Sequence, residues 1–126
     1  MPRYAALIYG AEPTNEEMND TEKWGQVMAE YVHFGETGGA AGVIGGGEAL
    51  QATNTATTIH VAGGAKGGEV ISTDGPFAET KEALGGFYLL DCKDLDEAIS
   101  WAAQIPGAWH GHVEVRPVID FSQGAG

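Results

Sequence analysis

Apolar residues alternate with polar or small ones in several short segments of this chain, and such alternation predicts β-strands with one buried face. Glycines weaken the strand predicted at residues 43–50, because a strand glycine has no side chain to pack. Two of the segments flank the sequence GGAKGG, and this arrangement predicts a β-hairpin. The segments that predict strands are residues 3–9, 43–50, 55–61, 69–73, 86–91 and 112–118.

A long first helix is predicted after the first strand. Thr14 and Glu17 form a capping box that opens it, and Asp20 is a second candidate start after a kink. Gly38 and Gly39 are expected to end the helix. Its apolar stripe consists of Trp24, Val27, Met28, Tyr31 and Phe34.

A shorter second helix is predicted between the last two strands. Asp94 caps it, with Glu97 three residues on, and the Ile-Pro-Gly sequence at residues 105–107 stops it. Its predicted buried stripe consists of Leu95, Ala98, Ile99 and Ala102.

The order of these elements indicates an α+β fold with a ferredoxin-like sheet and two helices on one face. The other face is predicted to be mixed, since His112, Glu114 and Arg116 share it with aromatic rings from Tyr9 or Tyr88. A face of this kind suits a second subunit. We therefore expect a homodimer with a lined cavity between two sheets.

Composition narrows the class of protein. The 126 residues suit one domain spanning 1–126, with a frayed tail at 119–126. The chain has no long apolar run, and its N-terminal segment lacks the long apolar region of a signal peptide. Its net charge of −12 argues against nucleic acid and anionic membranes as partners. The single Cys92 fits a reducing cytoplasm and is expected to be a buried or half-buried, unreactive cysteine.

The segment TDGPFAET, residues 73–80, is the most unusual connection in the chain. Asp-Gly-Pro is typical of a turn, and Asp74 could stabilise that turn through its own side chain or act as a carboxylate at the mouth of a site. Phe77 is interpreted either as the wall of a pocket or as an anchor in the core. The charged residues Glu79, Lys81 and Glu82 are expected to be a solvated face unless Lys81 pairs with a carboxylate at a pocket.

The sequence STDGPFAETKEALGGFYLLDCKDLDEAISWA, followed by GHVEVRPV, resembles the DGPF-type branch of the YCII-related family. The resemblance covers roughly residues 3–118. It implies a dimeric α/β-barrel type of fold in a cytoplasmic protein, with some members linked to transcription through sigma factors. Shorter members suggest a His-Asp pair in a cleft for lyase or hydrolase chemistry. Asp74 occupies the matching acidic position, and His33 is a weak candidate for the histidine.

A metal site is a weaker alternative. His110, His112 and Glu114 follow at a spacing of two residues, and imidazole and carboxylate are ligands for transition metals. Arg116 continues the same row and would repel a cation. We therefore expect no metal and no cofactor.

Two functions follow from the sequence. The first is a homodimer with a small-molecule site at the sheet interface near Asp74 and cofactor-free acid/base chemistry. The alternative is a non-enzymatic ligand sensor or protein-interaction module linked to transcription, so whether the chain is an enzyme stays open. The candidate ligand-binding residues are Tyr9, Glu48, Phe77, Glu79, Lys81, Glu114 and Arg116.

Overall fold

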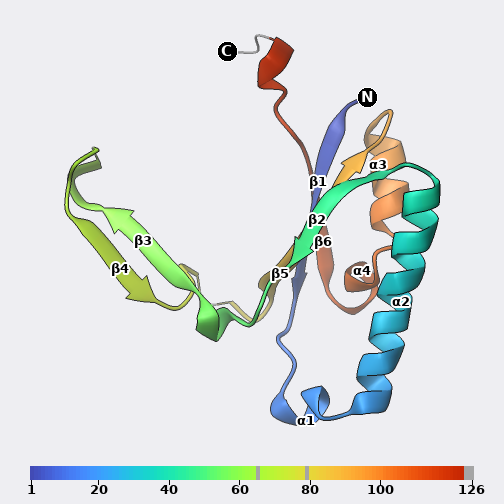
Figure 1. Ribbon diagram of the computed structural model, residues 1–126, viewed down its shortest axis with the longest axis horizontal. Helices are drawn as coiled ribbons and strands as arrows, with labels where there is room; N and C mark the ends of the chain where they lie inside the picture. Colours follow the sequence, from blue (N-terminus) through green and yellow to red (C-terminus); the bar gives the residue numbers. More distant parts are fainter. Residues whose placement is uncertain (65, 79, 124–126) are drawn as a thin grey trace.

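The computed structural model describes residues 1–64, 66–78 and 80–123 as a mixed α+β protein built on an antiparallel sheet (Figure 1). The strands are β1 (Arg3–Gly10), β2 (Ile44–Ala49), β3 (Thr57–Val61), β4 (Val70–Asp74), β5 (Ala83–Asp91) and β6 (His112–Pro117). The helices are α1 (Asn15–Met18), α2 (Thr21–Ala40), α3 (Leu95–Ala102) and α4 (Pro106–His110). All six predicted strands are confirmed to within a few residues.

Four strands form the main sheet in the order β2-β5-β1-β6, and every neighbouring pair is antiparallel. The helices α2, α3 and α4 lie on one side of this sheet, so its other face is left open (Figure 1). The predicted hairpin is confirmed, but β3 and β4 pair only with each other and leave the sheet as a projecting arm on the open side. We call residues 57–74 the arm.

The three predicted helix starts are confirmed. The Thr14 hydroxyl accepts a hydrogen bond from the Glu17 backbone N–H, and the Glu17 carboxylate accepts one from the Thr14 N–H, each at 3.2 Å. The Asp20 carboxylate then accepts from Lys23 N–H at the start of α2, which confirms the kinked second start. At α3 the Asp94 carboxylate accepts from Glu97 N–H at 2.9 Å.

Gly38 and Gly39 do not end α2, contrary to the prediction, because the helix continues to Ala40. Gly38 is buried, and a Cβ there would lie 2.7 Å from Cδ1 of Ile44. The glycine therefore lets the helix approach the sheet closely rather than break the helix. The chain turns afterwards at Gly42, whose φ of +70° favours glycine.

The core lies between the sheet and the helices. Ala6 and Leu90 from the sheet and Ile105 before α4 are fully buried, and Phe34 of α2 packs edge-on against Tyr88 at a centroid distance of 5.0 Å. Tyr88 therefore belongs to the core side, which corrects the option of placing it on the open face.

The predicted buried stripe of α3 is half right. Ala98 and Ala102 are buried, whereas Leu95 and Ile99 are 46% and 51% exposed. This helix ends at Ala102, ahead of the predicted stop at residues 105–107, and that segment instead begins the short α4, which carries His110.

Strand β2 lies at one edge of the sheet and is distorted by its glycines. Its register with β5 shifts between Ile44 and Gly46, and Gly47 has a φ of +153°. A Cβ on Gly47 would lie 2.5 Å from the Phe87 carbonyl oxygen, so only glycine fits there. None of the described helices is long and apolar enough to cross a membrane.

Candidate functional site

The open face of the sheet is mixed, as predicted, and its rows follow from strand register. Tyr9 of β1 lies between Leu84 of β5 and His112 of β6. In the next row inward, Leu7 lies between Phe87 and Glu114. Each row therefore has apolar side chains at its centre and an ionisable group on β6.

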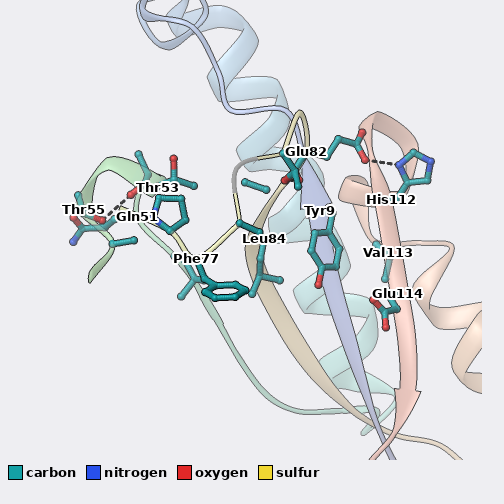
Figure 2. A pocket seen from close by; sticks show the side chains of 17 residues that line it. Tyr9, Gln51, Thr53, Thr55, Phe77, Glu82, Leu84, His112, Val113 and Glu114 are labelled. Carbon is teal, nitrogen blue, oxygen red and sulfur yellow. Dashed lines mark hydrogen bonds and ion pairs between the residues drawn. The ribbon is translucent and has the colours of Figure 1, made fainter. Parts of the chain in front are cut away.

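A cleft of about 870 Å³ lies where this face meets the connections on either side of the arm (Figure 2). One wall is the row of Leu84, Tyr9 and His112, and the other is built by residues 50–53, 55–56 and 76–78 together with Thr80. Most of the lining side chains are apolar. The described lining residues are Tyr9, Leu50, Gln51, Ala52, Thr53, Thr55, Ala56, Pro76, Phe77, Ala78, Thr80, Glu82, Ala83, Leu84, His112, Val113 and Glu114.

A histidine–carboxylate pair lies at the sheet end of the cleft. Nδ1 of His112 is 2.6 Å from Oε1 of Glu82, and Figure 2 shows Glu82 reaching across to the imidazole. The His112 side chain is 81% exposed and the Glu82 side chain 35% exposed. An ionised carboxylate only accepts hydrogen bonds, so Nδ1 of His112 is the donor in this contact.

The threonine hydroxyls around the cleft donate hydrogen bonds elsewhere. Thr53 donates through both its N–H and its hydroxyl to the Glu12 carboxylate, at 2.6 and 2.9 Å. The Thr55 hydroxyl donates to the Ala52 carbonyl at 2.7 Å, and the Thr80 hydroxyl donates to the Glu82 carbonyl. These bonds fix the loop wall. The Tyr9 hydroxyl makes no hydrogen bond within the described part of the chain and is left as a donor.

Charge on the open face is largely paired. Arg116 donates from Nε to Glu114, and this hydrogen bond, with the attraction between the charges, raises the pKa of Arg116. Glu48 lies on the same face opposite Phe87, but it is not among the described residues that line the cleft. Neither lysine nor arginine is among those lining residues either, so the cleft offers its ligand carboxylates and hydroxyls rather than fixed cations.

Two comparisons with known proteins agree with one another. The family model of the YCII-related domain matches residues 3–122 of the chain. The chain belongs to the YCII-related family. An uncharacterised protein of Rhizobium meliloti (strain 1021), named R00369, is 37% identical over 129 residues, which cover 96% of this chain and 95% of that protein. The family relationship suggested by the sequence is therefore confirmed.

The His-Asp pair that the YCII-related resemblance suggested is not brought together. Asp74 is exposed at the end of β4 in the arm and is not among the described lining residues of the cleft. His33 lies on α2, on the opposite side of the sheet, in a separate groove with Glu30 and Trp109.

The remaining ligand candidates divide into two groups. Tyr9, Phe77 and Glu114 line the cleft, and Phe77 is 91% exposed. Lys81 lines a smaller neighbouring hollow beside Glu12 instead. The prediction for Glu79 lies outside the described residues.

The alternative metal ligands do not converge. His110 ends α4 rather than lying on the strand, and its Nε2 is 3.5 Å from Oε1 of Glu30. His112 and Glu114 are paired with Glu82 and Arg116. Among the residues that the structure describes, no three histidine, cysteine or acidic side chains are grouped to hold a metal ion.

The pairing of His112 with Glu82 is the feature that the sequence interpretation misses, because a solvated face is the expectation for Glu82. Glu82 directly precedes β5, two residues before Leu84, and Leu84 lies in the row of His112. The signal that could have found this contact is the strand order, because β5 and β6 both pair with β1 and so bring the start of β5 close to the start of β6.

Proposed function

We propose that the chain acts in the cytoplasm as a homodimer whose open sheet faces pack together around a small-molecule site. The strand order, with the helices on one side, supports a ferredoxin-like protomer of the dimeric α/β-barrel type. The observation that carries the proposal is the cleft between the open face and the 76–80 connection.

The form of the cleft supports small-molecule binding. Its volume of about 870 Å³ falls in the range of ligand pockets, which are mostly apolar with a few polar groups that fix orientation. Here those groups are the Tyr9 hydroxyl, Glu114 and the pair of His112 with Glu82. Ionisable side chains of this kind support cofactor-free acid/base chemistry of the lyase or hydrolase class.

Dimerisation is tested by placing a charge at the centre of the open face. In the Leu7→Glu variant an unpaired carboxylate would be buried between the two sheets, which costs several kcal/mol. Analytical ultracentrifugation should show a wild-type dimer and a Leu7→Glu monomer. Met28→Glu, on the exposed side of α2, is the matched control and should remain dimeric. A monomeric wild-type chain at high concentration contradicts the proposed dimer.

Ligand binding is tested with Nile red, an uncharged apolar dye whose fluorescence rises in apolar sites. The wild-type protein should bind it saturably. Leu84→Trp fills the cleft and should weaken binding at least about tenfold, whereas Met28→Trp on the helix side should not. Equal binding by all three proteins would show that the dye does not enter the cleft, and the proposed site would then fail.

The arm favours a second candidate function, a module that binds another protein. Ile59 and Val70 are 56% and 64% exposed on this projecting hairpin, and exposed apolar clusters often mark interaction sites. A pull-down from a lysate at low salt should then recover the same protein with the wild-type chain but not with an Ile59→Ser, Val70→Ser variant. Identical recovery with both proteins argues against this function.

A further inference from the structure

We infer that the groove between α2 and α4 is a binding site for a guanidinium group, carried either by a small molecule or by an arginine side chain of another protein. This helix groove is lined by one face of α2, from Gln26 to Thr37, and by Gln104 and Trp109. It lies on the helix side of the sheet, opposite the cleft, so the inference does not depend on the proposed function (Figure 1).

Trp109 gives the helix groove a fixed aromatic wall. Its indole N–H donates to the Ala103 carbonyl at 2.8 Å, yet the residue is 55% exposed. The ring is therefore held in one position while much of its surface stays open to a ligand. Tryptophan attracts cations more strongly than the other aromatic side chains, and the protein cation found most often against such rings is the arginine guanidinium.

Glu30 supplies the opposite charge. Its side chain is 27% exposed, and its Oε1 lies 3.5 Å from Nε2 of His110, at the outer limit of a hydrogen bond. Its other oxygen, Oε2, makes no hydrogen bond within the part of the chain that the structure describes. A partly buried carboxylate with an unused oxygen can accept short, charge-assisted hydrogen bonds from a guanidinium.

The amide side chains near Glu30 match the remaining donors of a guanidinium, which has five N–H groups and no acceptor. Gln104 donates from Nε2 to the Ser100 carbonyl at 3.4 Å, so its side-chain oxygen is left to accept. Gln26 contributes a second amide oxygen to the lining. A planar cation with several donors suits this set of acceptors and the flat indole better than a compact ammonium does.

Charge in and around the helix groove favours a cation. Among its described lining residues Glu30 is the one acid, and none is a lysine or an arginine. The whole chain has a net charge of −12, which draws cations toward its surface. The volume of about 510 Å³ falls in the range of ligand sites. A guanidinium is therefore attracted to the groove and meets no fixed positive side chain among these residues.

The experiment is an NMR titration of the nitrogen-labelled full chain with N-butylguanidinium at about pH 8, where ordinary histidines are neutral. The reporter is the indole N–H resonance of Trp109, which is assigned by its loss in Trp109→Leu. This resonance should shift saturably. N-butylurea has the same planar shape without the charge and should cause no comparable shift.

Two matched variants test the carboxylate. Glu30→Gln should weaken binding of N-butylguanidinium about tenfold, because it removes a charged acceptor. Glu36→Gln removes the same charge from an exposed position of α2 that is not among the described lining residues, and it should bind as the wild-type protein does. Trp109→Leu, followed through the backbone amides of α2, should bind about threefold more weakly.

Three results would overturn the inference. Equal weakening by Glu30→Gln and Glu36→Gln would show attraction to the overall charge of the protein rather than a site. Equal shifts with N-butylurea would exclude a guanidinium as the recognised group. A wild-type protein that shows no saturable shift fails the inference directly, whatever the Nile red result says of the cleft.

The same titration separates the two sources of the guanidinium. The second probe is the peptide acetyl-Gly-Arg-Gly-amide, which presents the group on a protein backbone. Binding at least about tenfold tighter than that of N-butylguanidinium supports an arginine of a partner protein, since only the peptide can add contacts from its backbone. Equal or weaker binding of the peptide supports a small guanidinium compound and excludes the partner protein.

Discussion

The main sheet and the arm are both antiparallel β-structure, but only the sheet has a core of its own. Ala6 and Leu90 of the sheet are fully buried against the helices, whereas Val70 and Ile71 of the arm are 64% and 44% exposed. A two-stranded hairpin alone is only marginally stable in water. The sheet with its helices therefore provides most of the folding stability. The arm is attached only at its two ends and exposes apolar side chains.

The largest expected effect comes from removing a core side chain. Phe34 is 2% exposed and packs against Tyr88 and Trp101, so Phe34→Ala leaves a cavity and should lower the free energy of unfolding by about 3–5 kcal/mol. Ile71→Ala in the arm should change it by about 0.5 kcal/mol or less. Urea unfolding followed by circular dichroism measures both. Similar losses in the two variants would contradict the comparison.

Two neighbouring glycines of α2 test how closely this helix packs against the main sheet. Gly38→Ala places a methyl group against Ile44 and should cost about 1–3 kcal/mol through overpacking. A methyl group on the neighbouring Gly39 would meet no atom within 4 Å, so Gly39→Ala should stabilise the helix by about 0.5 kcal/mol. Thermal and urea unfolding of the two variants should therefore shift in opposite directions.

Replacing the arm tests the other region directly. The Gly75 N–H donates to the Ala56 carbonyl at 2.7 Å, so the two ends of the arm are already adjacent. Exchanging residues 57–74 for Gly-Gly should leave a cooperatively folded sheet, with a stability change below about 1 kcal/mol. Loss of cooperative unfolding in this variant would show that the arm is part of the folding unit.

The smallest expected effect concerns acid stability at the start of the helices. Hydrogen bonds from Thr14 N–H and then from Lys23 lower the pKa of Glu17. A lowered pKa contributes stability above the ordinary carboxyl pKa, and this stability is lost as pH falls through the folded-state value. Melting temperatures measured against pH should fall slightly less on acidification in Glu17→Gln than in the wild-type protein. If the melting temperatures of the two proteins fall in parallel with pH, Glu17 makes no such contribution to acid stability.

Much of the fold could be predicted from local pattern. The capping boxes at Thr14 and Asp94 depend on residues three positions apart, so sequence alone locates them. Whether the hairpin joins the main sheet depends on which strands pair with β5, and pairing between strands far apart in the sequence cannot be predicted from local pattern. The face of the sheet on which the Tyr88 side chain lies depends on the register of β5, and no local sequence pattern determines that register.

The candidate site could be predicted in part. Strand alternation and the unusual 73–80 connection point to Tyr9, Phe77 and Glu114, and all three line the cleft. Family resemblance points to Asp74 and His33, and the fold separates them. The contact of Glu82 with His112 joins the residue before β5 to the first residue of β6, two strands that flank β1, so it can be predicted only after the strand order is known.

The distorted edge of β2 has a consequence for how the protein behaves in a crowded cell. A straight, exposed edge strand invites other chains to extend the sheet and seeds fibrils. The shift at Ile44–Gly46 and the unusual backbone of Gly47 twist the hydrogen-bonding groups of β2 out of line. These glycines therefore make β2 a less regular template for the addition of a further strand.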